Sequence, residues 1–199
     1  MWPFPSSSNE KRLYLDFAAA TPVHVAALRA MEEAGPFFAN PSAIHRDGLA
    51  AQELLESVRK KVAAVFEVPA HTMYFTSGGT EGNNLAIFGA ARARVFAHPE
   101  KKVHLVVSSI EHASILEPIA HMSDMGVSVT LVAPDTEGRI TAAAVREVLT
   151  PDTALVSVGW ANGEVGTVQS LHTIAQCIRA YEKEHGSSIV FHTDAGQAP

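Results

Sequence analysis

Short apolar runs alternate along the chain with longer stretches in which apolar residues recur at helical spacing. The runs are nearly continuous in apolar residues, which is typical of strands covered by helices on both faces. The intervening stretches are long enough to form crossover helices between parallel strands. Strands are predicted over 73–77, 103–109, 127–133, 154–159 and 188–194, and helices over 47–67 and 171–185 and from about Thr80, His112 and Thr141. The pattern predicts an α/β fold with three α/β/α layers around a mainly parallel sheet.

Composition and charge narrow the class of protein. The 199 residues are 47% hydrophobic and 18% charged, which is ordinary for a globular protein that needs no disulfide or metal for its stability. The formal net charge of −6 argues against a nucleic-acid surface. The single Cys177 suits a reducing compartment, and neither a secretion signal nor a membrane span is visible, so a cytoplasmic protein is expected. Residues 1–12 are expected to form a flexible lead.

Polar segments follow four of the predicted strands, where each strand gives way to the next element. They lie at 78–81, 109–112, 160–167 and 192–197. Ligands of parallel α/β sheets bind beyond the carboxyl ends of the strands. The four turns are therefore expected to converge on one pocket.

The first of these segments, within SGGTE at 77–81, indicates an anion site. Glycines allow the backbone to approach a ligand closely, and the following helix directs free N–H groups to the same place. Gly79 and Thr80 are the expected phosphate contacts. The fingerprints of the P-loop and of the dinucleotide fold are both missing. A plain turn in which Thr80 or Ser77 caps the helix is the alternative.

The segments at 109–112 and 192–197 carry titratable side chains that could take part in catalysis or binding. His112 stands at the start of a predicted helix, where the helix dipole favours a neutral imidazole that could serve in catalysis. The alternative is a surface or capping contact. His192 and Asp194 share one strand face, as a metal pair would, but no third ligand is visible and no metal is expected. A carboxylate at the end of an apolar strand, like Asp194, requires a cation or a strong donor. A protonated pyridine nitrogen would serve, while a helix cap or a surface Lys is the alternative partner.

Five segments, in order, resemble the cysteine desulfurases of the class V aminotransferase group, which depend on pyridoxal 5′-phosphate (PLP). They are LYLDFAAATP at 13–22, NPSAIHRDG at 40–48, FTSGGTEGNNLAI at 75–87, SIEHASIL at 109–116 and HTDAGQ at 192–197. The resemblance implies the large domain of the PLP-dependent transferases, of the aspartate aminotransferase type. Residues 13–199 would form its N-terminal part, and the C-terminal part and the small domain would lie outside this chain.

The resemblance also implies a role for each matching position. Gly79 and Thr80 would hold the cofactor phosphate, and Gln197 would bind the phenolic oxygen of the ring. His112 would stack on the pyridine ring and relay protons. Asp194 would pair with the protonated ring nitrogen, which makes the ring a better electron sink.

Two departures from the family pattern stand out. Asn162 matches the first of two consecutive asparagines, but Gly163 replaces the second. The Lys that binds the cofactor covalently and the Cys that accepts sulfur have no match among the 199 residues. Cys177 is expected on the packed side of a helix instead.

The activity implied by the resemblance is conversion of L-cysteine to L-alanine, with sulfur transferred as a persulfide to iron–sulfur cluster or thiolation pathways. The complete enzyme would be a homodimer that serves a sulfur-acceptor protein, and the 199-residue fragment alone is expected to be inactive. Another class V enzyme, such as a selenocysteine lyase or a small-amino-acid aminotransferase, is one alternative. A non-catalytic PLP-fold module that binds a partner is the other.

Overall fold

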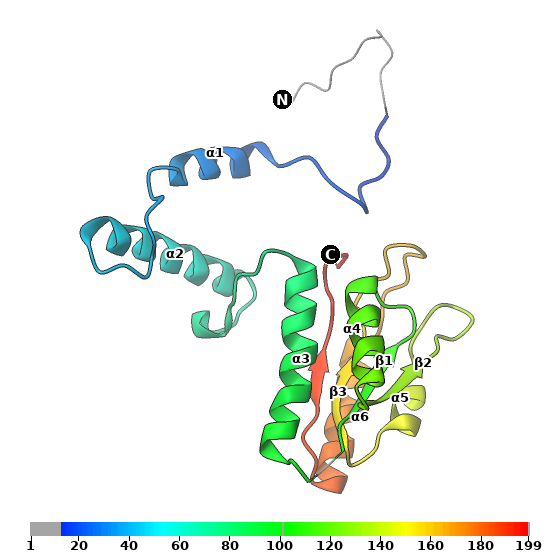
Figure 1. Cartoon of the computed structure of the whole chain (residues 1–199). Coiled ribbons are helices and arrows are strands. Elements are labelled where there is room, and N and C mark those ends of the chain that lie inside the picture. Colours follow the sequence, from blue (N-terminus) through cyan, green and yellow to red (C-terminus); the bar gives the residue numbers. More distant parts are fainter. Residues whose placement is uncertain (1–12, 101, 199) are drawn as a thin grey trace. The chain divides into compact units, whose positions relative to one another are not determined.

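The computed structural model describes residues 13–100 and 102–198, which fall into two compact units. The first unit ends at Phe75 and the second begins at Thr76 (Figure 1). The flexible lead predicted for residues 1–12 lies outside the described residues. No helix of the described residues combines the length and the apolar character that crossing a membrane requires.

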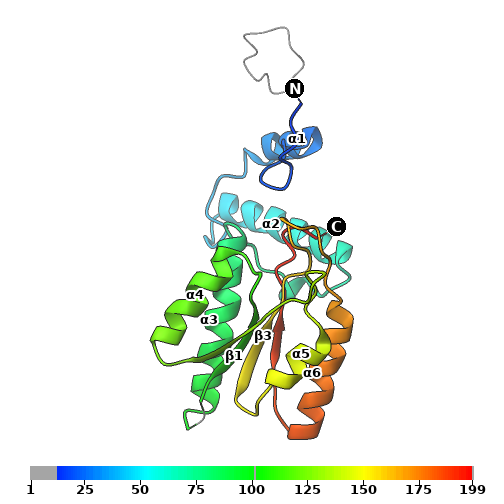
Figure 2. The same ribbon diagram turned by 90° about the vertical axis from the view of Figure 1, so that its right-hand side faces the viewer.

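A four-stranded parallel sheet forms the centre of the second unit, in the order β2-β1-β3-β4. Helices α3 and α4 cover one face of the sheet, and α5 and α6 cover the other (Figures 1 and 2). The elements are α3 (Gly79–Ala97), β1 (His104–Ser108), α4 (Ala113–Asp124), β2 (Ser128–Val132), α5 (Ala142–Val148), β3 (Thr153–Ser157), α6 (Leu171–His185) and β4 (Val190–His192). The predicted three-layer fold is confirmed.

The two central strands are buried along their whole length, which explains their continuous apolar sequence. Alternate residues of β1 enter different cores. Leu105 and Val107 contribute to the core under α3 and α4, whereas Val106 contributes to the core under α5 and α6. A strand buried on both faces leaves its carboxyl end as the place where polar groups can meet a ligand.

Residues 73–77 were predicted as a strand, and this prediction is wrong. They have no regular secondary structure, and Tyr74 is 81% exposed. A strand needs a hydrogen-bonded neighbour, and the described sheet contains only the four strands above. The first polar segment therefore follows an extended loop.

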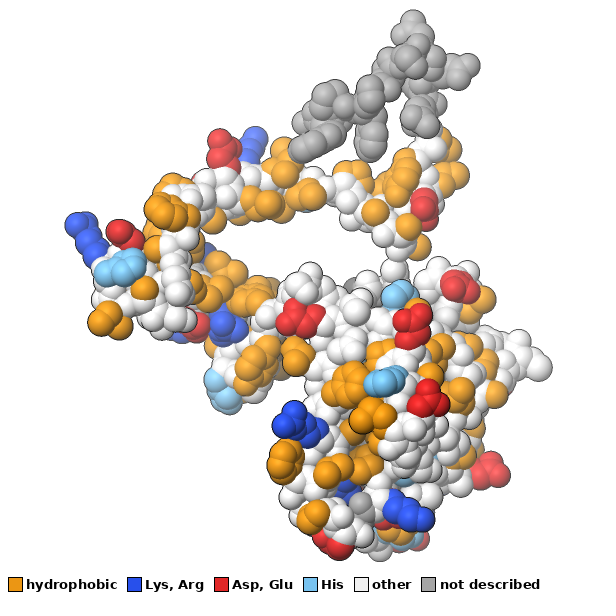
Figure 3. All heavy atoms as spheres, in the orientation of Figure 1, with side chains coloured by type: hydrophobic (Ala, Val, Ile, Leu, Met, Phe, Trp, Pro, Cys, Tyr) orange, Lys and Arg blue, Asp and Glu red, His pale blue; other side chains and the backbone are white. Residues whose placement is uncertain are grey.

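The first unit contains α1 (Val25–Ala34), α2 (Arg46–Val65) and the short 3-10 helix η1 (Ala70–Thr72). The prediction for 47–67 matches α2, whereas α1 was not predicted, although its Ala, Leu, Met and Glu residues favour helix. None of the residues of α1 is buried. Hydrophobic side chains cover much of the surface of the segment that contains α1 and α2 (Figure 3).

His104 connects three strands from inside the sheet. It is 5% exposed, and its Nδ1 lies 2.9 Å from Thr153 Oγ1 while its Nε2 lies 2.9 Å from Thr130 Oγ1. Burial lowers the pKa of His104, and the charge of Asp152 opposes this effect. The folded protein therefore favours the neutral ring.

Acid is expected to destabilise the second unit partly through His104. Its folded pKa lies below that of the unfolded chain, about 6.5, so its contribution is complete above that pH and is lost as the pH falls through the folded pKa. Thermal unfolding followed by circular dichroism between pH 7.5 and 5 should show a smaller decline for His104→Gln than for the unsubstituted chain. His121→Gln, at an exposed position, is the control. Equal declines in all three proteins would contradict the assignment. Burial also lowers the pKa of His192. Part of the loss of stability in acid should therefore remain in every variant.

Candidate functional site

The N-terminus of α3 offers backbone donors to open space. The first turn of a helix leaves its N–H groups without intrahelical partners, and Gly78 at the N-cap position has no side chain to satisfy them. A Cβ built on Gly78 or Gly79 would meet no atom within 4 Å, and Thr80 is exposed. The carboxylate of Glu81 accepts from the backbone N–H of Ser77 at 2.6 Å, which lowers the pKa of Glu81. Free N–H groups at a helix end of this kind are typical of anion sites.

His112 caps the N-terminus of α4. Its Nδ1 accepts a hydrogen bond from Ser114 N at 3.1 Å and lies 2.8 Å from Ser114 Oγ. The side chain is exposed. The capping contact that was the alternative role of His112 is present.

Asp194 follows β4, where its carboxylate accepts two hydrogen bonds. Oδ1 accepts from Gly196 N at 2.8 Å, and Oδ2 accepts from Asn83 Nδ2 at 2.8 Å. The backbone of Asp194 also accepts from Trp160 N at 2.9 Å, which ties the segment to the loop after β3. The carboxylate is therefore fixed in orientation at the carboxyl edge of the sheet.

A chain of hydrogen bonds connects two of the predicted residues, Asp194 and His112. Asn83 Nδ2 contacts Asp194 and also donates to Ser114 Oγ at 2.9 Å, and Ser114 contacts His112. Thr80 lies one helical turn before Asn83 on α3. Asn83 was not among the residues predicted from the sequence, although a polar residue within the apolar stripe of a helix was a visible signal.

Glu111 is a second carboxylate that sequence analysis did not select. Burial raises its pKa, and the negative charge of Asp194 adds to this effect, whereas hydrogen bonds from Gly159 and Ser108 oppose it. Its Oε1 accepts from Gly159 N at 2.7 Å. A Cβ on Gly159 would lie 2.9 Å from Glu111 Oε2, so the absence of a side chain there gives the carboxylate its place.

His192 is not one of a group of three potential metal ligands, since no such group occurs among the described residues. Its Nδ1 lies 2.9 Å from Ser157 Oγ within the sheet. Its pKa is lowered by burial, with an opposing effect of Asp194. His192 therefore contacts the neighbouring strand β3 within the sheet.

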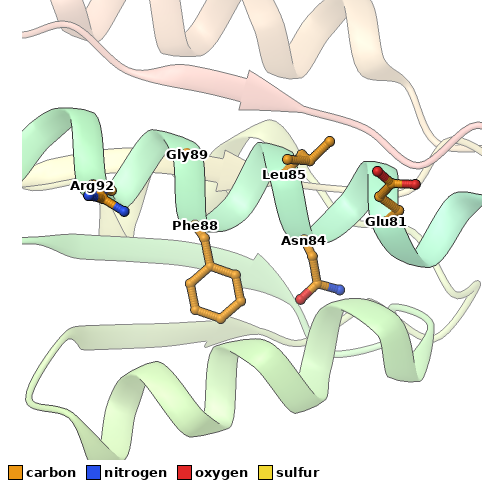
Figure 4. A pocket seen from close by; sticks show the side chains of 6 residues that line it. All are labelled: Glu81, Asn84, Leu85, Phe88, Gly89 and Arg92. Carbon is orange, nitrogen blue, oxygen red and sulfur yellow. The ribbon is translucent and has the colours of Figure 1, made fainter. Parts of the chain in front are cut away.

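An open depression lies on a different side of α3 (Figure 4). It is lined by Glu81, Asn84, Leu85, Phe88, Gly89 and Arg92. Successive helix residues are about 100° apart, so this face is turned well away from that of Asn83. None of the residues expected to contact the cofactor lines it, although Glu81 belongs to the polar segment 78–81.

Comparison with known protein families matches residues 13–199 to Aminotransferase class-V. The chain belongs to the class V aminotransferase family. Cysteine desulfurase IscS of Dictyoglomus turgidum is 35% identical over 192 residues, which are 94% of this chain and 45% of that protein. Putative cysteine desulfurase IscS 1 of Bacillus subtilis is 38% identical over 192 residues, 94% of this chain and 47% of that protein.

Solved structures agree with this assignment. The structure of SspA in complex with cysteine has a TM-score of 0.82 and 36% identity, covering 93% of this chain and 51% of that one. A NifS-like protein has a TM-score of 0.83 and 30% identity, covering 93% and 49%. The expected resemblance to cysteine desulfurases is confirmed. The chain spans about half the length of the relatives it matches.

The class V chain departs from the expected pattern around Gly163. Asn162 uses its side chain within the protein, accepting from Glu164 N and Val165 N and donating to Ile110 O at 3.2 Å. A Cβ on Gly163 would lie 3.3 Å from Gln197 Cγ. Gln197 therefore lies against the backbone where the second asparagine was expected, and Asn162 joins two loops at the edge of the sheet.

The described lysines of the second unit lie away from this site. Lys102 precedes β1 and Lys183 lies in the last turn of α6, which places both at the amino edge of the sheet. Cys177 lies on α6, half-buried, with its Sγ 3.4 Å from Ala142 O. Its predicted position on the packed side of a helix is confirmed.

Proposed function

We propose that this chain provides the cofactor-binding part of a PLP-dependent cysteine desulfurase. The observation that carries the proposal is the hydrogen-bond chain through Asn83, which brings Asp194 and His112 close to the N-terminus of α3. The similarity to cysteine desulfurases supports the substrate, L-cysteine. In the proposed reaction L-cysteine and a protein thiol give L-alanine and a protein persulfide.

The residues present fit PLP. The open N-terminus of α3 at Gly79 and Thr80 suits its phosphate, and Asp194 suits its ring nitrogen. Gln197 is the proposed contact of the phenolic oxygen, and Asn162 holds the neighbouring loop. When bound, the protonated ring would serve as an electron sink for bonds broken at the substrate.

His112 is the proposed proton carrier. Its Nδ1 accepts from the protein, so the exposed ring presents Nε2 for exchange of a proton with the substrate. The ring would also cover one face of the cofactor. Glu111 stays below it, bonded to Gly159, and supports the turn that presents His112.

The remaining assignments follow from the same proposal. Residues 13–199 would be the N-terminal part of the large domain, in a cytoplasmic homodimer that supplies a sulfur-acceptor protein for iron–sulfur cluster or thiolation pathways. The similarity to proteins named IscS favours the iron–sulfur cluster pathway. A selenocysteine lyase, an aminotransferase or a non-catalytic module are the competing functions.

Assay of the protein from its native source tests the proposal. With L-cysteine and PLP it should form alanine and persulfide in equal amounts. The 199-residue polypeptide alone should form no alanine above a free-PLP control, because none of its lysines matches the family's cofactor-binding Lys. Alanine from the short polypeptide would refute the second expectation.

Other products would identify the competing functions. Transfer of the amino group to a keto acid would indicate an aminotransferase, and reaction with selenocysteine alone would indicate the lyase. A native protein that binds PLP without turnover would indicate the non-catalytic module. Each of these results would overturn the desulfurase proposal.

A further inference from the structure

Asn83 is a buried amide within an apolar stripe of α3. It is 5% exposed, and Ile87 and Ala91, one and two turns further on, belong to the core under α3 and α4. Burial of an amide in such a place costs free energy unless its hydrogen bonds are made. The partners of its side chain therefore explain its position.

The Asn83 amide nitrogen donates to two separate segments. It reaches Ser114 Oγ on α4 at 2.9 Å and Asp194 Oδ2 after β4 at 2.8 Å. An amide has two N–H hydrogens, so both are used. Since Asp194 Oδ1 accepts from Gly196 N, each oxygen of the carboxylate has a donor that fixes its orientation.

Ser114 continues the connection to His112. Its Oγ accepts from Asn83, which leaves the hydroxyl hydrogen to donate to His112 Nδ1 at 2.8 Å. Nδ1 also accepts from Ser114 N at 3.1 Å. A ring nitrogen that only accepts carries no hydrogen, so a neutral His112 has its proton on Nε2.

We propose that Asn83 is a positioning residue of the cofactor site, which fixes the Asp194 carboxylate and, through Ser114, the tautomer of His112. The inference rests on the proposed function, in which Asp194 meets the ring nitrogen and His112 covers the ring. One amide connects both groups, so they are set in place together.

A purely structural Asn83 would affect only the stability of the fold. A positioning Asn83 also affects the protonation of the bound ring, because a carboxylate that is free to rotate stabilises a protonated nitrogen less well. Pyridoxine 5′-phosphate is a suitable probe. It has the ring and phosphate but no aldehyde, so it binds without a covalent bond, and its ultraviolet absorption changes when the ring nitrogen loses its proton.

The experiment compares four 199-residue chains in titrations with pyridoxine 5′-phosphate. Asn83→Leu should weaken binding about tenfold and lower the pH at which the bound ring nitrogen loses its proton. Ser114→Ala keeps the contact of Asn83 with Asp194 and removes the hydroxyl that meets His112 Nδ1. It should therefore weaken binding less than Asn83→Leu does and leave the midpoint of the ring nitrogen unmoved. Asn84→Ala is the matched control, because the side chain of the neighbouring Asn84 donates to Thr80 O on its own helix rather than to Ser114 or Asp194.

Each outcome decides the inference. Folded Asn83→Leu with unchanged affinity and unchanged ring protonation would overturn it while the proposed site stands. Lack of binding by the unsubstituted chain would overturn the proposed site and the inference together. If Asn83→Leu does not fold, Asn83→Ser gives the same readout with a smaller change of the core. A lowered midpoint in an Asn83 variant, with Asn84→Ala unchanged, supports the inference.

Discussion

Replacing Asp194 with Ala is expected to lower the affinity of the chain for pyridoxine 5′-phosphate about 100-fold, because the protonated ring nitrogen would lose its proposed charged partner. The carboxylate is held at 2.8 Å by both Asn83 Nδ2 and Gly196 N. A charge fixed in this way stabilises a cation without the cost of ordering it at the moment of binding. Isothermal titration calorimetry at neutral pH measures the change.

Two further variants are compared in this experiment, one that separates charge from shape and one that serves as a distant control. Asp194→Asn keeps the size of the side chain and removes its charge, so it should lose most of the affinity. Asp124→Ala removes an exposed carboxylate at the far end of α4 and should bind like the unsubstituted chain. Tight binding by Asp194→Ala would refute the assignment of Asp194 to the ring nitrogen.

Replacing Gly48 with Ala should destabilise the first unit by about 1–3 kcal/mol. A Cβ at Gly48 would lie 2.5 Å from Ala43 O and 2.9 Å from Asn40 O, two backbone atoms that move only with the turn. The turn also contains the bond from Gly48 N to His45 Nδ1 at 3.2 Å. Hydrogen exchange of peptides from α2 measures the loss locally.

Gly89→Ala is the control, a helical glycine where an added methyl group has open space. Gly89 also lies in a helix, but a Cβ there meets no atom within 4 Å. Alanine favours helix by up to about 1 kcal/mol over glycine, so Gly89→Ala should stabilise α3. Destabilisation by both substitutions, or by neither, would show that the contacts around Gly48 are not what decides its effect.

The layers of the second unit could be predicted from the sequence because the spacing of apolar residues matches the burial of each strand and helix in the structure. The runs at 103–109 and 154–159 are apolar on both faces, and both became central strands. The run at 73–77 has a similar local composition without a partner strand among the described residues, and pairing is not a local property of the sequence. That is why one predicted strand is missing.

The site was only partly predictable for a similar reason. The rule that ligand groups gather at the carboxyl ends of parallel strands placed Asp194 and His112 together before any contact was known. Asn83 escaped selection because its importance lies in partners that are distant in sequence. The contact between Gln197 and Gly163 depends on loop conformations, which hydrophobic periodicity does not describe.

Helix α3 carries both the amides of Gly79 and Thr80 and the amide that holds Asp194. Thr80 and Asn83 are three residues apart, so about 4.5 Å of rigid helix separates them along the axis. In the proposed site, this length of helix separates the phosphate contacts from the residue that holds the partner of the ring nitrogen. The proposed site would then favour ligands whose anionic and cationic ends match this spacing.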